Sequence, residues 1–295
     1  MIIITGATGR LGRMTVERLL GHVPAEEIGV SVRDPEKAED LRERGVRVRR
    51  GDYADPASLA HAFEGASQVL IVSADTTGEA ALRLHRTAID AAVKAGAGRI
   101  VYTGHMGTSP SSLFPPMRDH AATEEALRAS GVPFTSLRNG FYASTTAALL
   151  DAALRTGELA VPEDGPVSWT SHDDLAEAAA ATLAEKIFDG VTPALTGGEA
   201  VDMAGVAALA SEITGRPIRH VVVSDAEYRS GLIAHGVPEH GADILTAMFA
   251  AARRSEFSRV DPALGRLLNR PPTPLRDVLG AALTPEPRRP GRDGQ

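Results

Sequence analysis

Short apolar runs alternate with segments of helical periodicity along the first half of the chain. Runs such as "VLIV" lack the apolar–polar alternation of a half-exposed strand, so we predict strands buried on both faces. The predicted strands cover residues 2–4, 28–32, 46–49, 68–72, 99–103 and 134–138. The predicted helices cover residues 11–20, 35–44, a segment starting at 56, 80–95 and 117–130. This order predicts an α/β protein with a Rossmann-type, doubly wound parallel sheet.

The second half of the chain is mainly helical. We predict helices over residues 143–155, 173–185, 204–214, 225–235 and 239–253, with short strands near 194–196 and 218–222. We therefore expect a sheet domain over residues 1–140. A small, mainly helical lobe over 141–283 would share part of the sheet and roof a cleft. The Pro-rich, charged remainder, 284–295, is predicted to be disordered.

Three glycines follow the first predicted strand at three-residue spacing. Gly6, Gly9 and Gly12 lie where the strand turns into a helix, and they lack the Cβ atoms that would keep a ligand away from the backbone. The first N–H groups and the dipole of the following helix favour an anion there. An ordinary strand-to-helix turn would also use small residues, and the spacing is not the common GxGxxG. The position at the start of a βαβ unit nevertheless favours the pyrophosphate of a dinucleotide.

The end of the second strand indicates which dinucleotide binds. An acidic residue at this point is typical of NAD sites, where it holds the ribose 2′-hydroxyl. Arg33 comes first here, and its planar guanidinium suits the 2′-phosphate of NADP(H). Asp34 precedes Pro35 and is interpreted as a helix N-cap. We therefore predict NADP(H) as the cofactor.

The next two strands end in residues that suit the rest of such a cofactor. Asp52 can accept a hydrogen bond from the adenine amino group, with Tyr53 beside the ring. Ser73 and Ala74 are small enough to let the cofactor pass over the edge of the sheet. The crevice of a doubly wound sheet opens at these carboxyl ends. Asp55, before a proline, is predicted to cap a helix.

Composition narrows the range of partners. The net charge of −7 and the pI of about 5.7 argue against nucleic acid and against an anionic membrane surface. The chain has no cysteine, which excludes disulfides and thiolate zinc sites, and His172 with its two following aspartates looks like a helix start, so we expect no metal. The sequence shows no signal-peptide pattern and no apolar run of about 18 residues. We expect a cytoplasmic protein that does not bind membranes.

Several stretches resemble the NmrA-like, atypical short-chain dehydrogenase/reductase family, and within it the NADPH-dependent quinone oxidoreductase 2 type. They include "MIIITGATGRLG", "AAVKAGAGRIVYTG", "LRNGFY" and "VSWTSHDDLAEAAAATL", and the resemblance extends to about residue 283. It implies a Rossmann domain with a small C-terminal lobe, NADPH in the crevice and hydride transfer to a quinone. The cofactor-binding residues implied by position are Gly6, Thr8, Gly9, Arg10, Leu11, Gly12, Arg33, Ser73, Ala74, Thr103 and Gly104.

Two features depart from related enzymes. Ordinary short-chain dehydrogenases place a Lys four residues after a Tyr, and the Lys lowers the pKa of the Tyr that protonates a developing alkoxide. No Tyr of this chain has a Lys at that spacing, and Tyr102 is followed by Met106. The loop after the fifth strand carries "FPPM" at 114–117, where the quinone reductases tend to have small polar residues. We expect these four residues to change the lining of the pocket.

Three residues are candidates for contact with the reacting groups. His120 stands where related proteins often carry a Lys near the nicotinamide ribose, and it could bind a hydroxyl or supply a proton. His105 could face the nicotinamide, and Tyr142 could donate a hydrogen bond to a substrate carbonyl. Each also has a plain structural interpretation, as a helix-start histidine, a solvated loop residue and a packed aromatic ring.

A quinone is a good hydride acceptor and needs little acid–base help, so orientation over the nicotinamide can supply most of the acceleration. We therefore predict an NADPH-dependent oxidoreductase that acts on a quinone or a similarly activated acceptor. Two other hypotheses stay open: a non-catalytic, NADP-binding redox sensor of the NmrA type, and a tailoring reductase of secondary metabolism. The sequence also leaves a homodimer open.

Overall fold

The computed structural model describes residues 1–185 and 188–284, and its centre is a seven-stranded parallel sheet. The strand order is β10-β6-β5-β4-β1-β2-β3. The strands are β1 (Ile2–Thr5), β2 (Ile28–Val32), β3 (Arg47–Arg50), β4 (Gln68–Ile71), β5 (Arg99–His105), β6 (Phe134–Asn139) and β10 (Gly190–Val191). The predicted doubly wound α/β fold is confirmed. The order reverses at β1, and a crevice is expected outside the carboxyl ends at this point.

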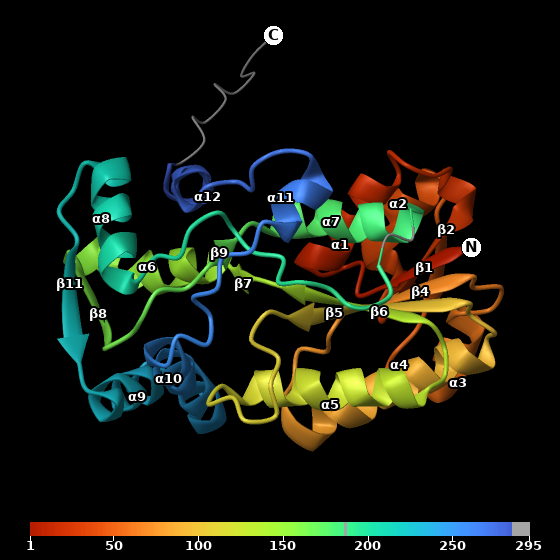
Figure 1. Ribbon diagram of the computed structural model, residues 1–295, viewed down its shortest axis with the longest axis horizontal. Helices are drawn as coiled ribbons and strands as arrows, with labels where there is room; N and C mark the ends of the chain where they lie inside the picture. The colour runs from red at the N-terminus through yellow and green to blue at the C-terminus, as the bar shows by residue number, and fades with distance from the viewer. Residues whose placement is uncertain (186–187, 285–295) are drawn as a thin grey trace, which may run out of the picture.

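Helices cover both faces of the sheet (Figure 1). One layer contains α1 (Arg10–Leu19), α2 (Glu39–Glu43), α7 (His172–Glu185) and α11 (Ala263–Leu268), and the other contains α3 (Pro56–Ala62), α4 (Gly78–Lys94) and α5 (Pro115–Ala129). Alternate side chains of β1 enter different cores: Ile4 packs in the cluster that includes α1, whereas Ile3 packs in the cluster that includes α3 and α4. Because both faces are covered, every residue of β1 is buried.

The lobe lies beyond the carboxyl ends of the sheet strands, at the left of Figure 1. It contains α6 (Ser144–Thr156), α8 (Met203–Thr214), α9 (Asp225–Ala234), α10 (Glu239–Arg253) and α12 (Leu275–Leu283), with the strand pairs β7 (Phe141–Tyr142) with β9 (Trp169–Thr170) and β8 (Glu158–Pro162) with β11 (Arg219–Val223). Trp169 is 2% exposed in the lobe core, and its Nε1 donates to the Val201 carbonyl at 2.9 Å. No helix in the described ranges is both long and apolar enough to cross a membrane.

Some predicted elements were wrong. The helix expected over 35–44 is divided into a 3₁₀ turn at Pro35–Ala38 and α2. The strand expected at 194–196 is a single bridge between Leu195 and Asn139, and the chain joins the sheet earlier, at β10. The predictions omitted β8, α11 and α12, which are short and gain their stability from contacts with distant parts of the chain. The expected tail lies outside the described residues, apart from its first residue, Thr284.

Residues after 140 complete the sheet domain. Strand β10 pairs with β6, and α7 lies against α1 and α11. Leu175 and Leu183 of α7 are fully buried in the same cluster as Leu11 and Val16 of α1. The sheet domain therefore needs a helix from the second half of the chain to cover one face.

This packing predicts that a fragment ending at residue 140 does not fold by itself. Without α7, the apolar face of α1 would be exposed to water at a cost of about 1.5–3 kcal/mol for each large side chain. Circular dichroism of the fragment during heating should show no cooperative transition, whereas the full chain should show one. A fragment of residues 1–140 that melts cooperatively would contradict this account.

Candidate active site

The glycine loop leaves the backbone at the start of α1 open. Gly6 has a φ of +63°, which a residue with a side chain rarely adopts. A Cβ atom on Gly12 would lie 2.3 Å from the Gly6 carbonyl oxygen, so only glycine allows this turn to close. Gly9 is the N-cap of α1 and provides no side-chain hydrogen bond to the first N–H groups of the helix. These groups and the helix dipole form a cradle that fits an anion such as a pyrophosphate.

A cleft of about 350 Å³ extends from this loop along the carboxyl ends of the strands. Thr8, Arg33, Asp52 and Ser73 all line it. The Ser31 Oγ atom lies in its wall and is buried without a hydrogen-bond partner in the described chain. An unpaired buried hydroxyl is costly, so this atom supports a polar ligand in the cleft.

The two residues after β2 lie in different surroundings. Arg33 is exposed at the mouth of the cleft. The Asp34 carboxylate accepts from the Glu36 N–H at 3.3 Å and lies 3.7 Å from Lys37 Nζ. Asp34 is therefore the N-cap of the following turn, and Asp55 caps α3 by accepting from the Ser58 N–H at 3.2 Å.

The residues after β3 line the cleft but are also held by the protein. Asp52 accepts from the Ala54 N–H at 2.9 Å. The Tyr53 hydroxyl donates to the Val72 carbonyl at 2.8 Å and hydrogen-bonds to Thr5, and burial raises the pKa of Tyr53. The hydroxyl is thus occupied, and only the remainder of the ring is available to a cofactor.

Four of the residues predicted to bind the cofactor differ in how deeply they are buried in the protein. Leu11 is buried, so only its backbone can face a ligand, whereas Arg10 is exposed. Thr103 Oγ1 accepts from the Ser73 N–H at 2.8 Å, and Gly104 is buried beneath Ser136. Thr103 and Gly104 therefore support the wall of the cleft from behind.

A second pocket, of about 270 Å³ and here called the inner pocket, lies beside the cleft. The two share the segment 73–76, and the inner pocket is also lined by His85, Pro116, Asp119, His120 and Ile244. Of the unusual loop residues, Pro116 lines this pocket, whereas Phe114 and Met117 are buried in the lobe core. Ile244 comes from α10, so the lobe forms one wall, as the sequence predicts.

His120 lies in the inner pocket beside a second predicted residue, His105. The rings are stacked with centroids 6.1 Å apart. The Tyr102 hydroxyl lies 2.7 Å from His120 Nδ1, and this nitrogen is its hydrogen-bond partner in the described chain. The phenol proton needs an acceptor, so we assign it to His120 Nδ1, and the proton of the neutral ring is then on Nε2. By the same reasoning, His105 accepts from the Gly107 N–H at 3.1 Å through Nδ1 and carries its proton on Nε2.

Both histidines are neutral. Burial lowers the pKa of His105 to about 3, and burial with the neighbouring His105 and His85 lowers the pKa of His120 well below its ordinary value. Burial likewise raises the pKa of Tyr102. The wall of the inner pocket therefore includes the neutral rings of His85 and His120, and the neutral His105 ring is stacked on His120.

Tyr142 is placed elsewhere. Its ring lies against His172 with centroids 4.1 Å apart, and burial raises its pKa to about 12. His172 begins α7, as predicted, and its pKa is lowered to about 4 by burial and by the nearby Arg10. The described contacts therefore join Tyr142 to the α1 side of the crevice and not to the stacked pair His105 and His120.

His85 lines the inner pocket but is not among the site residues predicted from the sequence. This residue of α4 is 1% exposed, and its Nε2 accepts from the Ala74 N–H at 2.9 Å. The available signal was its spacing, because Ala81, Ala88 and Ile89 lie on the same buried face of the helix. A polar ring among apolar neighbours indicates a buried hydrogen bond, although the partner cannot be read from the spacing.

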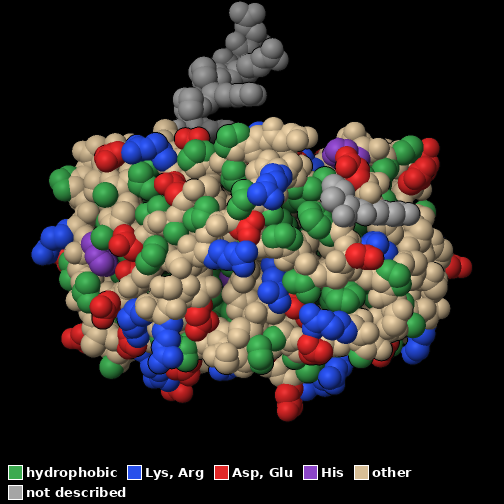
Figure 2. All heavy atoms as spheres, viewed as in Figure 1, with side chains coloured by type: hydrophobic (Ala, Val, Ile, Leu, Met, Phe, Trp, Pro, Cys, Tyr) green, Lys and Arg blue, Asp and Glu red, His purple; other side chains and the backbone are tan. Residues whose placement is uncertain are grey.

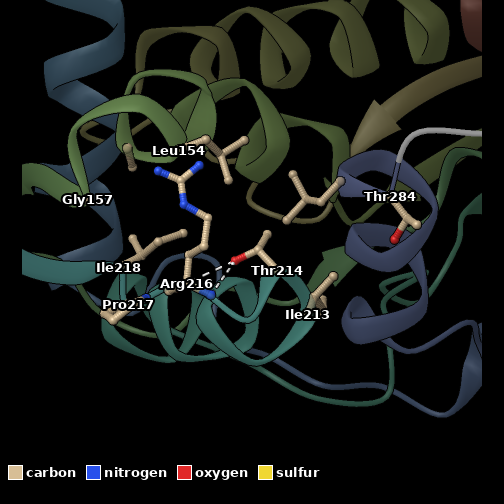
Figure 3. Close-up of a pocket in the computed structure, with 10 residues that line it drawn as sticks. Leu154, Gly157, Ile213, Thr214, Arg216, Pro217, Ile218 and Thr284 are labelled. Atoms are coloured by element: carbon tan, nitrogen blue, oxygen red, sulfur yellow. Dashed lines mark hydrogen bonds between the residues drawn. The ribbon is translucent and has the colours of Figure 1, made fainter.

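The described surface also has a hollow in the lobe, away from the glycine loop and the histidines of the inner pocket. This hollow, of about 450 Å³, is lined by Leu154, Ile213 and Ile218, and Arg216 extends across it (Figure 3). Among the described residues, its lining includes no carboxylate or histidine, and its elements differ from those around the glycine loop. Charges of both signs are interspersed over the face shown in Figure 2. Within residues 1–185 and 188–284, no group of three histidine, aspartate or glutamate side chains is arranged to hold a metal.

The sheet and the glycine cradle together define a dinucleotide-binding protein of the Rossmann type. Comparison with known proteins agrees, because a sequence profile of an NAD(P)H-binding family matches residues 6–186. Quinone oxidoreductase 2 of Escherichia coli (strain K12) is 35% identical over 282 residues, which cover 95% of this chain and 97% of that protein. This chain therefore belongs to the NAD(P)H-binding, NmrA-like family, as predicted.

Two solved structures are similar over almost the whole chain. One is the triphenylmethane reductase of Citrobacter sp. complexed with NADP(H), with a TM-score of 0.90 and 34% identity over 96% of this chain and 100% of that one. The other is the NADPH-dependent quinone oxidoreductase of Escherichia coli complexed with NADPH, with a TM-score of 0.91, 32% identity and the same coverage. These comparisons confirm the predicted class, an NAD(P)H-dependent oxidoreductase.

The neutral histidines predict how stability depends on pH. An unfolded histidine has a pKa of about 6.5, whereas burial holds the pKa values of His85 and His172 at about 4 in the folded state. As pH falls from about 6.5 to 4, the unfolded chain therefore binds protons that the native protein does not, and stability is lost. Each such histidine contributes up to about 1.4 kcal/mol per pH unit in this window and no slope above it.

Urea denaturation at several pH values between 7 and 5 measures this slope. We expect His172→Phe to reduce the slope of the free energy of unfolding against pH by up to about 1.4 kcal/mol per pH unit, the contribution of one proton. Tyr228→Phe should leave the slope unchanged, because burial raises the pKa of Tyr228 to about 12, far above this range. A wild-type free energy of unfolding that stays constant from pH 7 to 5 would refute the neutral, buried state of these histidines.

Proposed function

We propose that this protein is an NADPH-dependent reductase of quinones or similarly activated aromatic acceptors. The observation that carries the proposal is that the glycine-loop cleft and the inner pocket are neighbours with one shared wall, residues 73–76. A dinucleotide held by the glycine loop would extend along this wall toward the pocket of neutral histidines. The relatives named for quinone oxidoreduction and triphenylmethane reduction support an acceptor of this kind.

The residues present fit NADPH, which supplies a hydride when bound. The N–H groups at the start of α1 would hold its pyrophosphate, and the unpaired Ser31 Oγ is a polar contact still to be satisfied in the adenosine half of the cleft. Arg33, exposed at the mouth, would form charge-assisted hydrogen bonds to the 2′-phosphate. Asp34 does not compete with this role, because its carboxylate caps the next turn.

His120 is proposed to orient the acceptor through its Nε2 proton. Donation of that proton would require Nδ1 to take the Tyr102 proton, and the resulting phenolate would be buried where the pKa of Tyr102 is already raised. A proton transfer along this path is therefore unfavourable. A hydrogen bond from Nε2 to an acceptor oxygen forms no buried phenolate and avoids this cost. The proton that completes the reduction would come from solvent.

This electrostatic arrangement favours an activated acceptor. Lys37 and Lys94 do not line the cleft or the inner pocket, and the sequence places no Lys in α5. A simple ketone would need a strong proton donor for its alkoxide, whereas a reduced quinone oxygen is weakly basic. Orientation against the cofactor then becomes the main contribution of the protein.

The proposal predicts NADPH oxidation in the presence of quinones and a selective defect in Arg33→Ala. Without the guanidinium, KM for NADPH should rise about tenfold to a hundredfold, the usual effect of losing a charge-assisted hydrogen bond, with little change for NADH. The fall in absorbance of the reduced nicotinamide gives both rates. Arg216→Ala is the matched control, because this arginine lies in the lobe hollow.

The same assay separates the alternatives. A redox sensor would bind NADPH in calorimetry yet show no turnover with any quinone of the panel. An equal loss with NADPH and NADH in Arg33→Ala would remove the assigned role of Arg33 while leaving the activity in place.

The role proposed for His120 predicts that kcat does not depend on pH near neutrality. His120→Phe removes the donor and should lower kcat/KM for the acceptor about tenfold, whereas His120→Gln keeps an N–H group and should retain most of the activity. For the wild type, kcat should be flat between about pH 6 and 9, because the histidines of the pocket titrate below this range and the buried tyrosines above it. A kcat titration in this range that disappears in His120→Gln would instead make His120 a proton donor.

A further inference from the structure

The segment 73–77, here called the dividing loop, lies between the cofactor cleft and the inner pocket. Residues 73–76 line both, and Thr77 lines the inner pocket. The loop follows β4 and ends where α4 begins. Its position therefore decides where the two halves of a bound dinucleotide can lie. This inference rests on one part of the proposed function, the binding of the cofactor against this wall.

Each of several neighbouring elements holds one point of the dividing loop. The Ser73 N–H donates to Thr103 of β5 at 2.8 Å, and the Ala74 N–H donates to His85 of α4 at 2.9 Å. At the far end, Thr77 Oγ1 lies 2.8 Å from His240 Nε2 of α10. The contact at Ala74 is the one whose acceptor is an ionisable ring inside the protein.

The surroundings of His85 admit one protonation state. Thr123 Oγ1 donates its single proton to the Asp119 carbonyl at 2.8 Å, so it can only accept from His85 Nδ1, which lies 2.8 Å away. His85 Nδ1 must therefore carry a proton. The other nitrogen, Nε2, must be free of one, because it faces the Ala74 N–H. The ring is then neutral, and burial lowers its pKa to about 4 in agreement.

We propose that His85 is a positioning residue for NADP(H): its neutral, Nδ1-protonated ring holds the Ala74 amide and thereby fixes the dividing loop against the cofactor. His85 does not touch the reacting atoms in this account. It acts through the backbone of Ala74, which connects the helix layer of α4 and α5 to the rim of the cleft. The opposite tautomer would place two N–H groups face to face at Ala74.

Two substitutions of similar size separate this role from mere packing. In His85→Gln, the side-chain carbonyl can reach the position of Nε2 and accept from the Ala74 N–H. In His85→Asn, the shorter side chain reaches only the position of Nδ1, so it can still contact Thr123 but leaves the Ala74 amide without an acceptor. Both variants introduce an amide into the same site, and a general effect on packing would affect them equally.

Calorimetric titration of the full-length variants with NADP⁺ tests the proposal. We expect His85→Gln to bind within about threefold of wild type and His85→Asn to bind about fivefold to a hundredfold more weakly, the range for a buried amide without its acceptor. In steady-state assays, His85→Asn should raise KM for NADPH more than it lowers kcat. Equal affinities of the two variants would overturn the proposal, as would a wild type that does not bind NADP⁺.

Nuclear magnetic resonance of ¹⁵N-histidine-labelled wild type provides an independent test. The His85 resonances should report a protonated Nδ1 and an unprotonated, hydrogen-bonded Nε2 without any cofactor. A proton on Nε2 would overturn the proposal. Neither measurement depends on the acceptor, so a protein that reduces no quinone but shows both results would refute the proposed function and retain the role of His85.

Discussion

The close approach of Gly12 to the Gly6 carbonyl is the contact on which the candidate site depends. It allows α1 to begin directly beyond β1 and leaves the first N–H groups of the helix facing outward. Because β1 stands where the strand order reverses, the same turn lies at the centre of the crevice. The adenosine half of the cleft and the inner pocket are both arranged around that point, on neighbouring strands.

Burial without charge is the second constraint. His85 and His120 lie against Tyr102, His105 is stacked on His120, and burial lowers the pKa of each histidine. Each ring is held as a neutral donor or acceptor by a backbone or hydroxyl partner. Neutral rings can orient a ligand through hydrogen bonds without an ionic interaction.

The features that could be predicted from the sequence are those that local chemistry determines. The buried strands follow from continuous apolar runs, the caps at Asp34 and Asp55 from the following prolines, and the cradle from glycine spacing. The role of His85 and the return of α7 to the sheet domain depend on partners distant in the chain, such as Ala74 and α1. A periodic pattern shows that such a face is buried but not what covers it.

Tyr102 shows how one partner sets the chemistry available to a site. A lysine beside a tyrosine lowers the pKa of the phenol and makes it a proton donor for an alkoxide. In this chain the Tyr102 hydroxyl instead meets a neutral imidazole, and burial raises its pKa. The phenol keeps its proton and fixes the tautomer of His120. The partner of the phenol, a lysine or a neutral imidazole, therefore decides whether the phenol can act as a proton donor.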